Sequence, residues 1–85
     1  MAKVLVLRSA VALIAVAFVW DAADGADSYV LQIGSATTLS DVFNANVGNV
    51  LTDTETLLHG TYYSRVVPYA GASPLTATDE QVVTV

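Results

Sequence analysis

Residues 11–19 read VALIAVAFV, nine consecutive side chains without a polar group, and they run directly into Trp20 and Asp21. A strand in a small two-layer protein normally has one wet face, so its apolar residues alternate with polar ones. An unbroken apolar run instead indicates burial on both faces, contact with a partner, or insertion into a membrane. The residues on either side of the run bear on these alternatives.

The N-terminal residues imitate a secretory signal peptide. Lys3 and Arg8 precede the apolar run, and the small residues Ala22 and Ala23 follow it where a cleavage site would lie. Cleavage there would remove the only Trp from a body with little core to spare, and a transmembrane helix needs about 20 apolar residues, more than the run supplies. We therefore favour a β-strand over a membrane segment, and a signal role stays an open alternative.

Composition points to one small domain that has apolar surface to spare. The 85 residues include no Cys, so no disulfide can support the fold, and 54% are hydrophobic while only 13% are charged, against about 25% charged in an average domain. Contiguous exposed apolar surface usually marks an interaction site. With three Lys+Arg and a net charge of -5, the chain lacks the basic stripe that nucleic acids and anionic membranes require, so we expect a protein partner and no nucleic-acid or membrane partner.

Short strand-like segments alternate with turn-forming residues along the chain. The clearest is SYVLQIG, where Tyr29, Leu31 and Ile33 alternate with more polar neighbours. We expect seven strands, at residues 4–7, 13–19, 28–34, 41–47, 50–57, 62–69 and 81–85, with the loop 70–74 before the last. Seven short strands and no helix predict an antiparallel sandwich or barrel.

Two segments are harder to interpret. In residues 50–57, Thr52, Thr54 and Thr56 alternate with Leu51, Asp53, Glu55 and Leu57, so neither face is clearly apolar and the orientation of the strand stays open. Pro68 cannot donate a backbone hydrogen bond to a neighbouring strand, so we expect it at a strand end or beside a bulge.

Three motifs in order, FVWDA at residues 18–22, GADSYVLQI at 25–33 and LHGTYYSRV at 58–66, resemble a fibronectin type III domain. The resemblance implies an all-β, seven-stranded antiparallel immunoglobulin-like sandwich without a disulfide, spanning residues 1–85 as a single domain. Trp20 would then fill the space between the sheets, and a Tyr hydroxyl would bond the backbone at the corner. We expect that Tyr to be Tyr62, or Tyr63 if the turn is longer.

The chain departs from this family at two places. VLVL at residues 4–7 replaces the usual Pro-rich entry, which leaves the first sheet apolar on both sides. Ser64 stands where bacterial relatives commonly carry a large aromatic, so the core has a small hole there or is filled by Phe43 or Tyr69.

The strand alternation divides the apolar residues into a core set and a surface set. The expected core is Val16, Phe18, Trp20, Tyr29, Leu31, Ile33, Tyr62 and Val66. The expected interface residues are Ala15, Ala17, Val19, Tyr63 and Tyr69, because the first three face away from that core and Tyr suits interfaces by joining apolar area to a polar tip. Small Ala side chains also make a tolerable solvent-exposed face, which is the competing interpretation.

No set of residues predicts catalysis, a cofactor or a metal site. His59 is the only His and lies in an expected turn, and Asp53 and Glu55 read as a solvated strand face because nothing in the pattern indicates that one is buried. Asp21, Asp24 and Asp27 recur in one loop, but their spacing differs from a hand-type calcium loop, so we expect turn formation and leave calcium binding open.

We therefore expect a non-enzymatic structural protein that self-associates or docks into a larger assembly, with a virion or an extracellular location favoured over the cytoplasm. A phage decoration or tail component fits by analogy alone. The alternatives are a natural or engineered ligand-binding module that presents the loops 21–27, 47–49 and 70–74, and an accessory domain of a secreted bacterial enzyme.

Overall fold

The computed structural model describes residues 13–85, which form seven β-strands and no helix. The strands are β1 (Ile14–Val19), β2 (Ser28–Gly34), β3 (Phe43–Gly48), β4 (Thr52–Leu57), β5 (Thr61–Ala70), β6 (Ser73–Pro74) and β7 (Gln81–Thr84). The strand expected at residues 4–7 lies outside the described residues.

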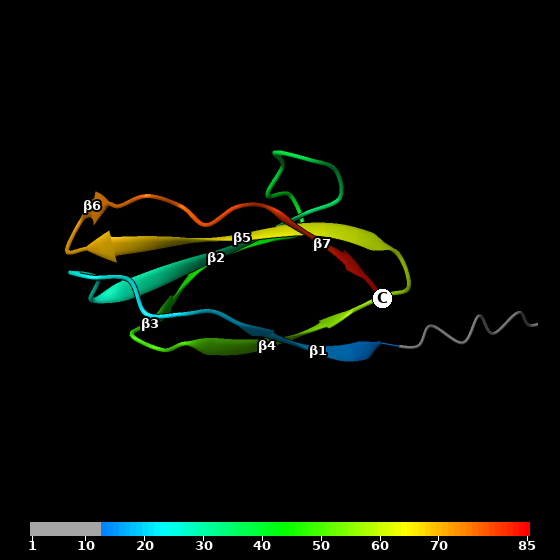
Figure 1. Cartoon of the computed structure of the whole chain (residues 1–85). Helices are drawn as coiled ribbons and strands as arrows, with labels where there is room; N and C mark the ends of the chain where they lie inside the picture. The colour runs from blue at the N-terminus through cyan, green and yellow to red at the C-terminus, as the bar shows by residue number, and fades with distance from the viewer. Residues whose placement is uncertain (1–12) are drawn as a thin grey trace, which may run out of the picture.

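The strands form two antiparallel sheets. β1 pairs with β4 in a two-stranded sheet, and the other sheet runs β3-β2-β5-β6, with β7 also pairing with β5. Figure 1 shows the β1–β4 sheet as one layer and the strands β2, β5, β6 and β7 as a second layer facing it. The all-β, helix-free prediction is confirmed, and the arrangement is consistent with a β-sandwich.

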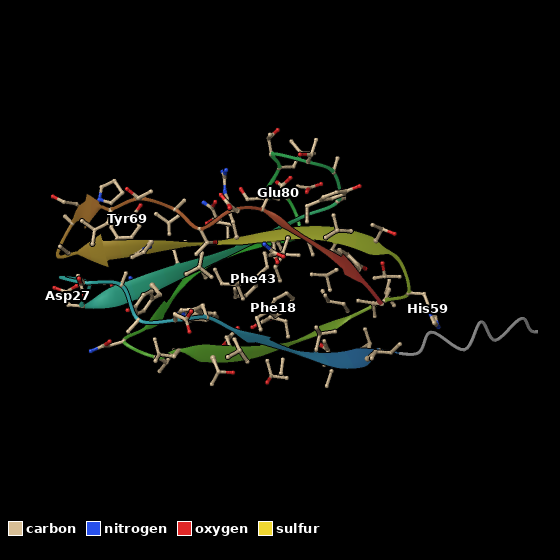
Figure 2. All side chains as sticks on the ribbon, viewed as in Figure 1. Phe18, Asp27, Phe43, His59, Tyr69 and Glu80 are labelled. Atoms are coloured by element: carbon tan, nitrogen blue, oxygen red, sulfur yellow. The ribbon has the colours of Figure 1, made fainter. Side chains whose placement is uncertain are left out.

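The core lies between the two sheets. Phe18 and Leu57 come from the β1–β4 sheet, and Leu31, Ile33 and Val66 come from the five-stranded sheet. In Figure 2 the side chains of Phe18 and Phe43 both lie between the layers. Burying each of these large side chains contributes about 1.5 to 3 kcal/mol to folding, so contact between the layers stabilises both sheets.

Trp20 continues the inward series of β1 one residue past the end of the strand. Its ring centroid lies 6.0 Å from that of Tyr29, with an interplanar angle of 50°. The backbone N–H of Trp20 donates to Leu51 O at 3.0 Å, and the Tyr29 hydroxyl accepts from Ala23 N at 3.0 Å. The loop after β1 is thereby held against the core.

β5 is the longest strand and organises its sheet. It pairs with β2 along Ser28–Gly34, with β6 near its end and with β7 near its start. Pro68 lies near the end of β5 opposite Tyr29, where the β2–β3 register shifts in a bulge. The expected loop at residues 70–74 instead contains β6, because the chain reverses at Gly71 (φ +61°) and pairs back onto β5.

The corner between β4 and β5 is closed by Tyr62. Its hydroxyl donates to the carbonyl oxygen of Leu58 at 2.9 Å, the backbone contact expected of a Tyr at this corner. The corner is also tied to the end of the chain, since Gly60 and Val85 exchange backbone hydrogen bonds of 3.0 and 2.9 Å.

Candidate functional site

The side of the β1–β4 sheet that faces away from the core is small, flat and uncharged. On β1 the exposed residues are Ala15, Ala17 and Val19, which alternate with the half-buried Val16 and the buried Phe18. The register places Thr56, Thr54 and Thr52 of β4 beside them, and all three are exposed. We call these six residues, Ala15, Ala17, Val19, Thr52, Thr54 and Thr56, the outer face.

Exposed apolar side chains gather on and beside this sheet. Eight large hydrophobic residues are exposed among those described, and five of them lie on β1 or within two residues of an end of β1 or β4: Leu13, Val19, Val50, Leu51 and Leu58. Val19 is 76% exposed and Leu13 62%. The remaining three, Leu39, Val42 and Val82, belong to the five-stranded sheet or its loops. Such an accumulation is typical of an interaction surface.

Tyr63 and Tyr69 are not part of this surface. Both are half-buried on β5, where they alternate with the buried residues Ser64, Val66 and Pro68, and they therefore face away from the β1–β4 sheet. They were expected as interface candidates separate from the outer face, and the structure places them on the opposite side of the molecule.

The residues expected in the core lie between the sheets. Phe18, Trp20, Tyr29, Leu31, Ile33 and Val66 are buried, while Val16 and Tyr62 are partly buried and pack against them. Leu57 and Ser64 are buried as well. Leu57 was missed because the polar residues that alternate with it on β4 hid the inward face of that strand.

Asp53 and Glu55 point inward, so the expectation of a solvated strand face is wrong. Both are half-buried, and each shares its face of the sheet with a β1 residue turned toward the core, Phe18 beside Asp53 and Val16 beside Glu55. Asp53 Oδ2 is buried and has no hydrogen-bond donor within the described residues. A hydrogen bond shared with Asp53, partial burial and the charge of the Asp53 carboxylate raise the pKa of Glu55 to about 7.

The missing donor at Asp53 Oδ2 and the raised pKa of Glu55 have one explanation. A carboxylate only accepts hydrogen bonds, whereas a protonated carboxyl can donate one. A proton on Glu55 therefore supplies the donor that Asp53 Oδ2 lacks, and it also removes one of two neighbouring negative charges. The neighbouring Asp53 carboxylate and partial burial therefore favour the protonated form of Glu55.

His59 and the aspartates of the first loop form no common site. Figure 2 places His59 at one end of the molecule and Asp27 with Tyr69 at the other. His59 Nδ1 lies 3.2 Å from Val85 O, and Gly71 N donates to both carboxylate oxygens of Asp27 at 3.1 and 3.0 Å. Across residues 13–85, no group of three or more His, Asp or Glu side chains is arranged to hold a metal ion.

Ser64 is buried on β5, and Phe43 packs against the core. An open pocket of about 500 Å³ lies beside Ser64, and Phe18, Trp20, Arg65 and Asp79 are among its other lining residues. Trp20 Nε1 is buried there without a partner among the described residues.

Comparison of this chain with known proteins identified no relative. Within residues 13–85, no helix has the length and apolar character that a bilayer crossing demands. No family model, no curated protein and no solved structure matches this chain.

Proposed function

We propose that this chain is a non-enzymatic structural module, of fibronectin type III-like fold, that associates through the outer face of its β1–β4 sheet with copies of itself or with a larger assembly. The observation that carries the proposal is the gathering of five of the eight exposed large hydrophobic residues on and beside this one sheet.

The chemistry of the outer face supports this role. It carries Ala, Val and Thr side chains and no charge, while the two carboxylates of β4 are turned inward. The cores of protein interfaces are depleted of charged residues, because desolvating an unpaired charge is costly. None of the six outer-face residues is charged, so this face can be buried without desolvating an ion of its own.

Strand order and one hydrogen bond support the finer fold assignment. In an immunoglobulin-type sandwich the second and fifth strands share one sheet, while the third, sixth and seventh share the other. Among residues 13–85 the strands divide in a similar way, because β1 and β4 share one sheet and β2, β5 and β7 share the other, where β3 also pairs with β2. The Tyr62 hydroxyl bonds Leu58 O four residues upstream, as the tyrosine of such a corner does.

The test places a charge in the middle of the outer face. We expect the wild-type chain to associate in sedimentation velocity as its concentration rises, and Ala17→Lys to raise the dissociation constant by about tenfold or more, because the ammonium group must be desolvated. Ala72→Lys makes the same change at an exposed residue of the β5–β6 turn and serves as the matched control. Thermal unfolding of both variants verifies that they fold.

Two results would overturn the proposal. One is a wild-type chain that stays monomeric at high concentration. The other is an Ala17→Lys variant that associates as strongly as Ala72→Lys.

A ligand-binding module that uses its loops is the second candidate. One contact favours it, because Asp27 accepts from Gly71 N and so joins the loops 21–27 and 70–74 at one end of the molecule. Partner capture by these loops would be insensitive to Ala17→Lys, which separates this function from the first.

A further inference from the structure

β4 is a regular strand, and within residues 13–85 both β4 and β1 are edges of the two-stranded sheet. Of the two, only β4 carries charged side chains. Among residues 13–85 it pairs only with β1, and its six residues keep one register with no bulge, no Pro and no Lys or Arg. The edges of the five-stranded sheet differ: β3 pairs through a bulge, β6 has two residues and contains Pro74, and β7 has four residues. A long regular edge offers unpaired backbone groups to another strand.

The only feature of β4 that opposes such pairing is its pair of inward carboxyls. Inward-pointing charged residues are one of the devices that keep edge strands from joining, because a second strand would trap the charges. Asp53 and Glu55 are placed in this way, beside Phe18 and Val16 of β1. The protection lasts only while both groups are ionised.

Among residues 13–85, Asp53 is the only charged group that shifts the pKa of Glu55. The neighbouring strands turn only uncharged side chains into the space between the sheets: Ile14, Val16 and Phe18 on β1, Tyr29, Leu31 and Ile33 on β2, Phe43 and Val47 on β3, Tyr62, Ser64 and Val66 on β5, and Val83 on β7. The pKa of Glu55 is raised to about 7 by the hydrogen bond with Asp53, by burial and by the charge of Asp53. The pair therefore loses one of its two charges on mild acidification.

We propose that two copies of this chain pair through β4, antiparallel and centred on Thr54, and that the charge on the inward carboxyl of Glu55, beside Asp53, decides whether they do. The inference rests on the proposed function, because it takes self-association as given. The partner is a second copy, the contact is the β4 edge, and the edge can pair when Glu55 is protonated.

The register follows from the residues on both faces of β4. Centring on Thr54 sets Asp53 opposite Glu55 of the second copy, and directly opposite residues have Cβ atoms about 4.5 to 5.5 Å apart. Four carboxyls then meet on the inner face. With all four ionised the strands repel, whereas one proton in each Asp53–Glu55 pair leaves a donor for every orphaned acceptor.

The same register brings exposed apolar residues together at both ends of the strand pair. Val50, 40% exposed, falls opposite Leu58, 47% exposed, and Leu51, 42% exposed, falls opposite the buried Leu57. Pairing also joins the two outer faces into one continuous surface across a four-stranded sheet. A shift of one residue would instead oppose inward with outward side chains, so the hydrophobic pattern favours this register.

Sedimentation equilibrium at two pH values tests whether the charge of Glu55 controls pairing through β4. At about pH 8.5 a group with a pKa near 7 is protonated in about one molecule in 30, so a dimer that needs the proton on both copies has an apparent dissociation constant about a thousandfold higher than at about pH 5.5. Glu55→Gln mimics the protonated side chain and is expected to associate equally at both pH values. Asp79→Asn removes an exposed carboxylate elsewhere and is expected to keep the wild-type pH dependence.

Crosslinking tests the register. The chain has no native Cys, so a single introduced thiol reports one position. At about pH 6 a short bifunctional maleimide is expected to link Thr54→Cys to its own copy, whose Cβ lies about 5 Å away. In Thr56→Cys the two thiols are separated by four residues of strand, about 13 Å, so little crosslinking is expected.

The outcomes separate this inference from the proposed function. Pairing controlled by Glu55 is overturned if association is equal at both pH values, or if Glu55→Gln keeps the wild-type pH dependence. This holds even if Ala17→Lys still blocks association. If the wild-type chain does not associate at about pH 5.5 or at about pH 8.5, both the proposed self-association and the pairing through β4 are overturned.

Discussion

At the residue scale, Gly34 is the glycine with the least space for a side chain. The chain folds back over the end of β2, where Val42 N donates to Ile33 O at 3.0 Å and Leu39 N to Ala36 O at 3.2 Å. A Cβ added at Gly34 would lie 2.1 Å from the carbonyl oxygen of Leu39. The obstacle is backbone, which cannot rotate away as a flexible side chain would. The loop after β2 can pack this closely only because residue 34 is Gly.

Gly34→Ala is therefore expected to lower the free energy of unfolding by about 3 kcal/mol, at the upper end of overpacking costs. Gly25→Ala is the control, because its Cβ would meet nothing within 4 Å and its only penalty is the left-handed backbone at φ +82°, worth about 1 kcal/mol. Urea unfolding of the two variants measures the difference. Equal losses would show that the loop yields to the added methyl group.

At the scale of elements, the corner between β4 and β5 is held by a hydrogen bond from the side-chain hydroxyl of Tyr62. Tyr62 reaches back from β5 to Leu58 O at 2.9 Å, just past the end of β4. Tyr62→Phe keeps the ring and removes the hydrogen bond, so the free energy of unfolding is expected to fall by about 1 kcal/mol. Tyr63→Phe, one residue along the same strand, makes the same change where no hydroxyl hydrogen bond is present in the described residues and is expected to cost less. Denaturant midpoints for the two variants decide the point, and equal losses would contradict it.

How much the sequence predicts differs from strand to strand. β2 was located to the residue, because its alternation of apolar and polar side chains is clean, and the outward direction of Ala15, Ala17 and Val19 followed from that of Phe18. β4 resisted interpretation because its inward face holds two carboxyls beside Leu57, a pattern that local periodicity cannot tell from an exposed face. β6 is too short for any periodic signal.

The candidate site was only partly predictable for a related reason. That Ala17 lies beside Thr54 depends on the pairing of β1 with β4, a contact between segments far apart in the chain that no local pattern encodes. The raised pKa of Glu55 depends in turn on which face of β4 meets the core. Tyr63 and Tyr69 were expected at an interface by residue type, which carries no information about the side of the molecule on which they lie.

At the scale of the whole molecule, two sets of carboxyl groups change the free energy of unfolding in opposite directions as pH falls. The hydroxyl and backbone N–H of Ser35 donate to Asp41 and lower its pKa, and Thr37 and Thr38 do the same for Glu80. Glu80 thereby ties the loop after β2 to the segment just before β7. These contacts favour the ionised carboxylates, so their contribution is present above the ordinary pKa of each group and is lost as pH falls through the lowered value.

Glu55 acts in the opposite direction. Its pKa is about 7 in the folded chain against 4.5 ordinarily, so between these values the folded state binds more protons than the unfolded state. The free energy of unfolding must then decrease as pH rises from about 4.5 to about 7, and it stays lower above that range. Together with the acid-side loss from Asp41 and Glu80, this predicts maximum stability near pH 5.

Urea unfolding across this range, at protein concentrations low enough to keep the chain monomeric, measures the effect. Glu55→Gln is expected to remove the decline between about pH 4.5 and 7 while leaving the acid-side loss in place. Asp41→Asn is expected to do the reverse, weakening the acid-side loss and leaving the decline toward neutrality unchanged. If the Glu55→Gln curve keeps the wild-type slope, the shared proton is not what couples stability to pH. If the slope is removed, the pair that sets the stability of the monomer is also the pair proposed to open its β4 edge.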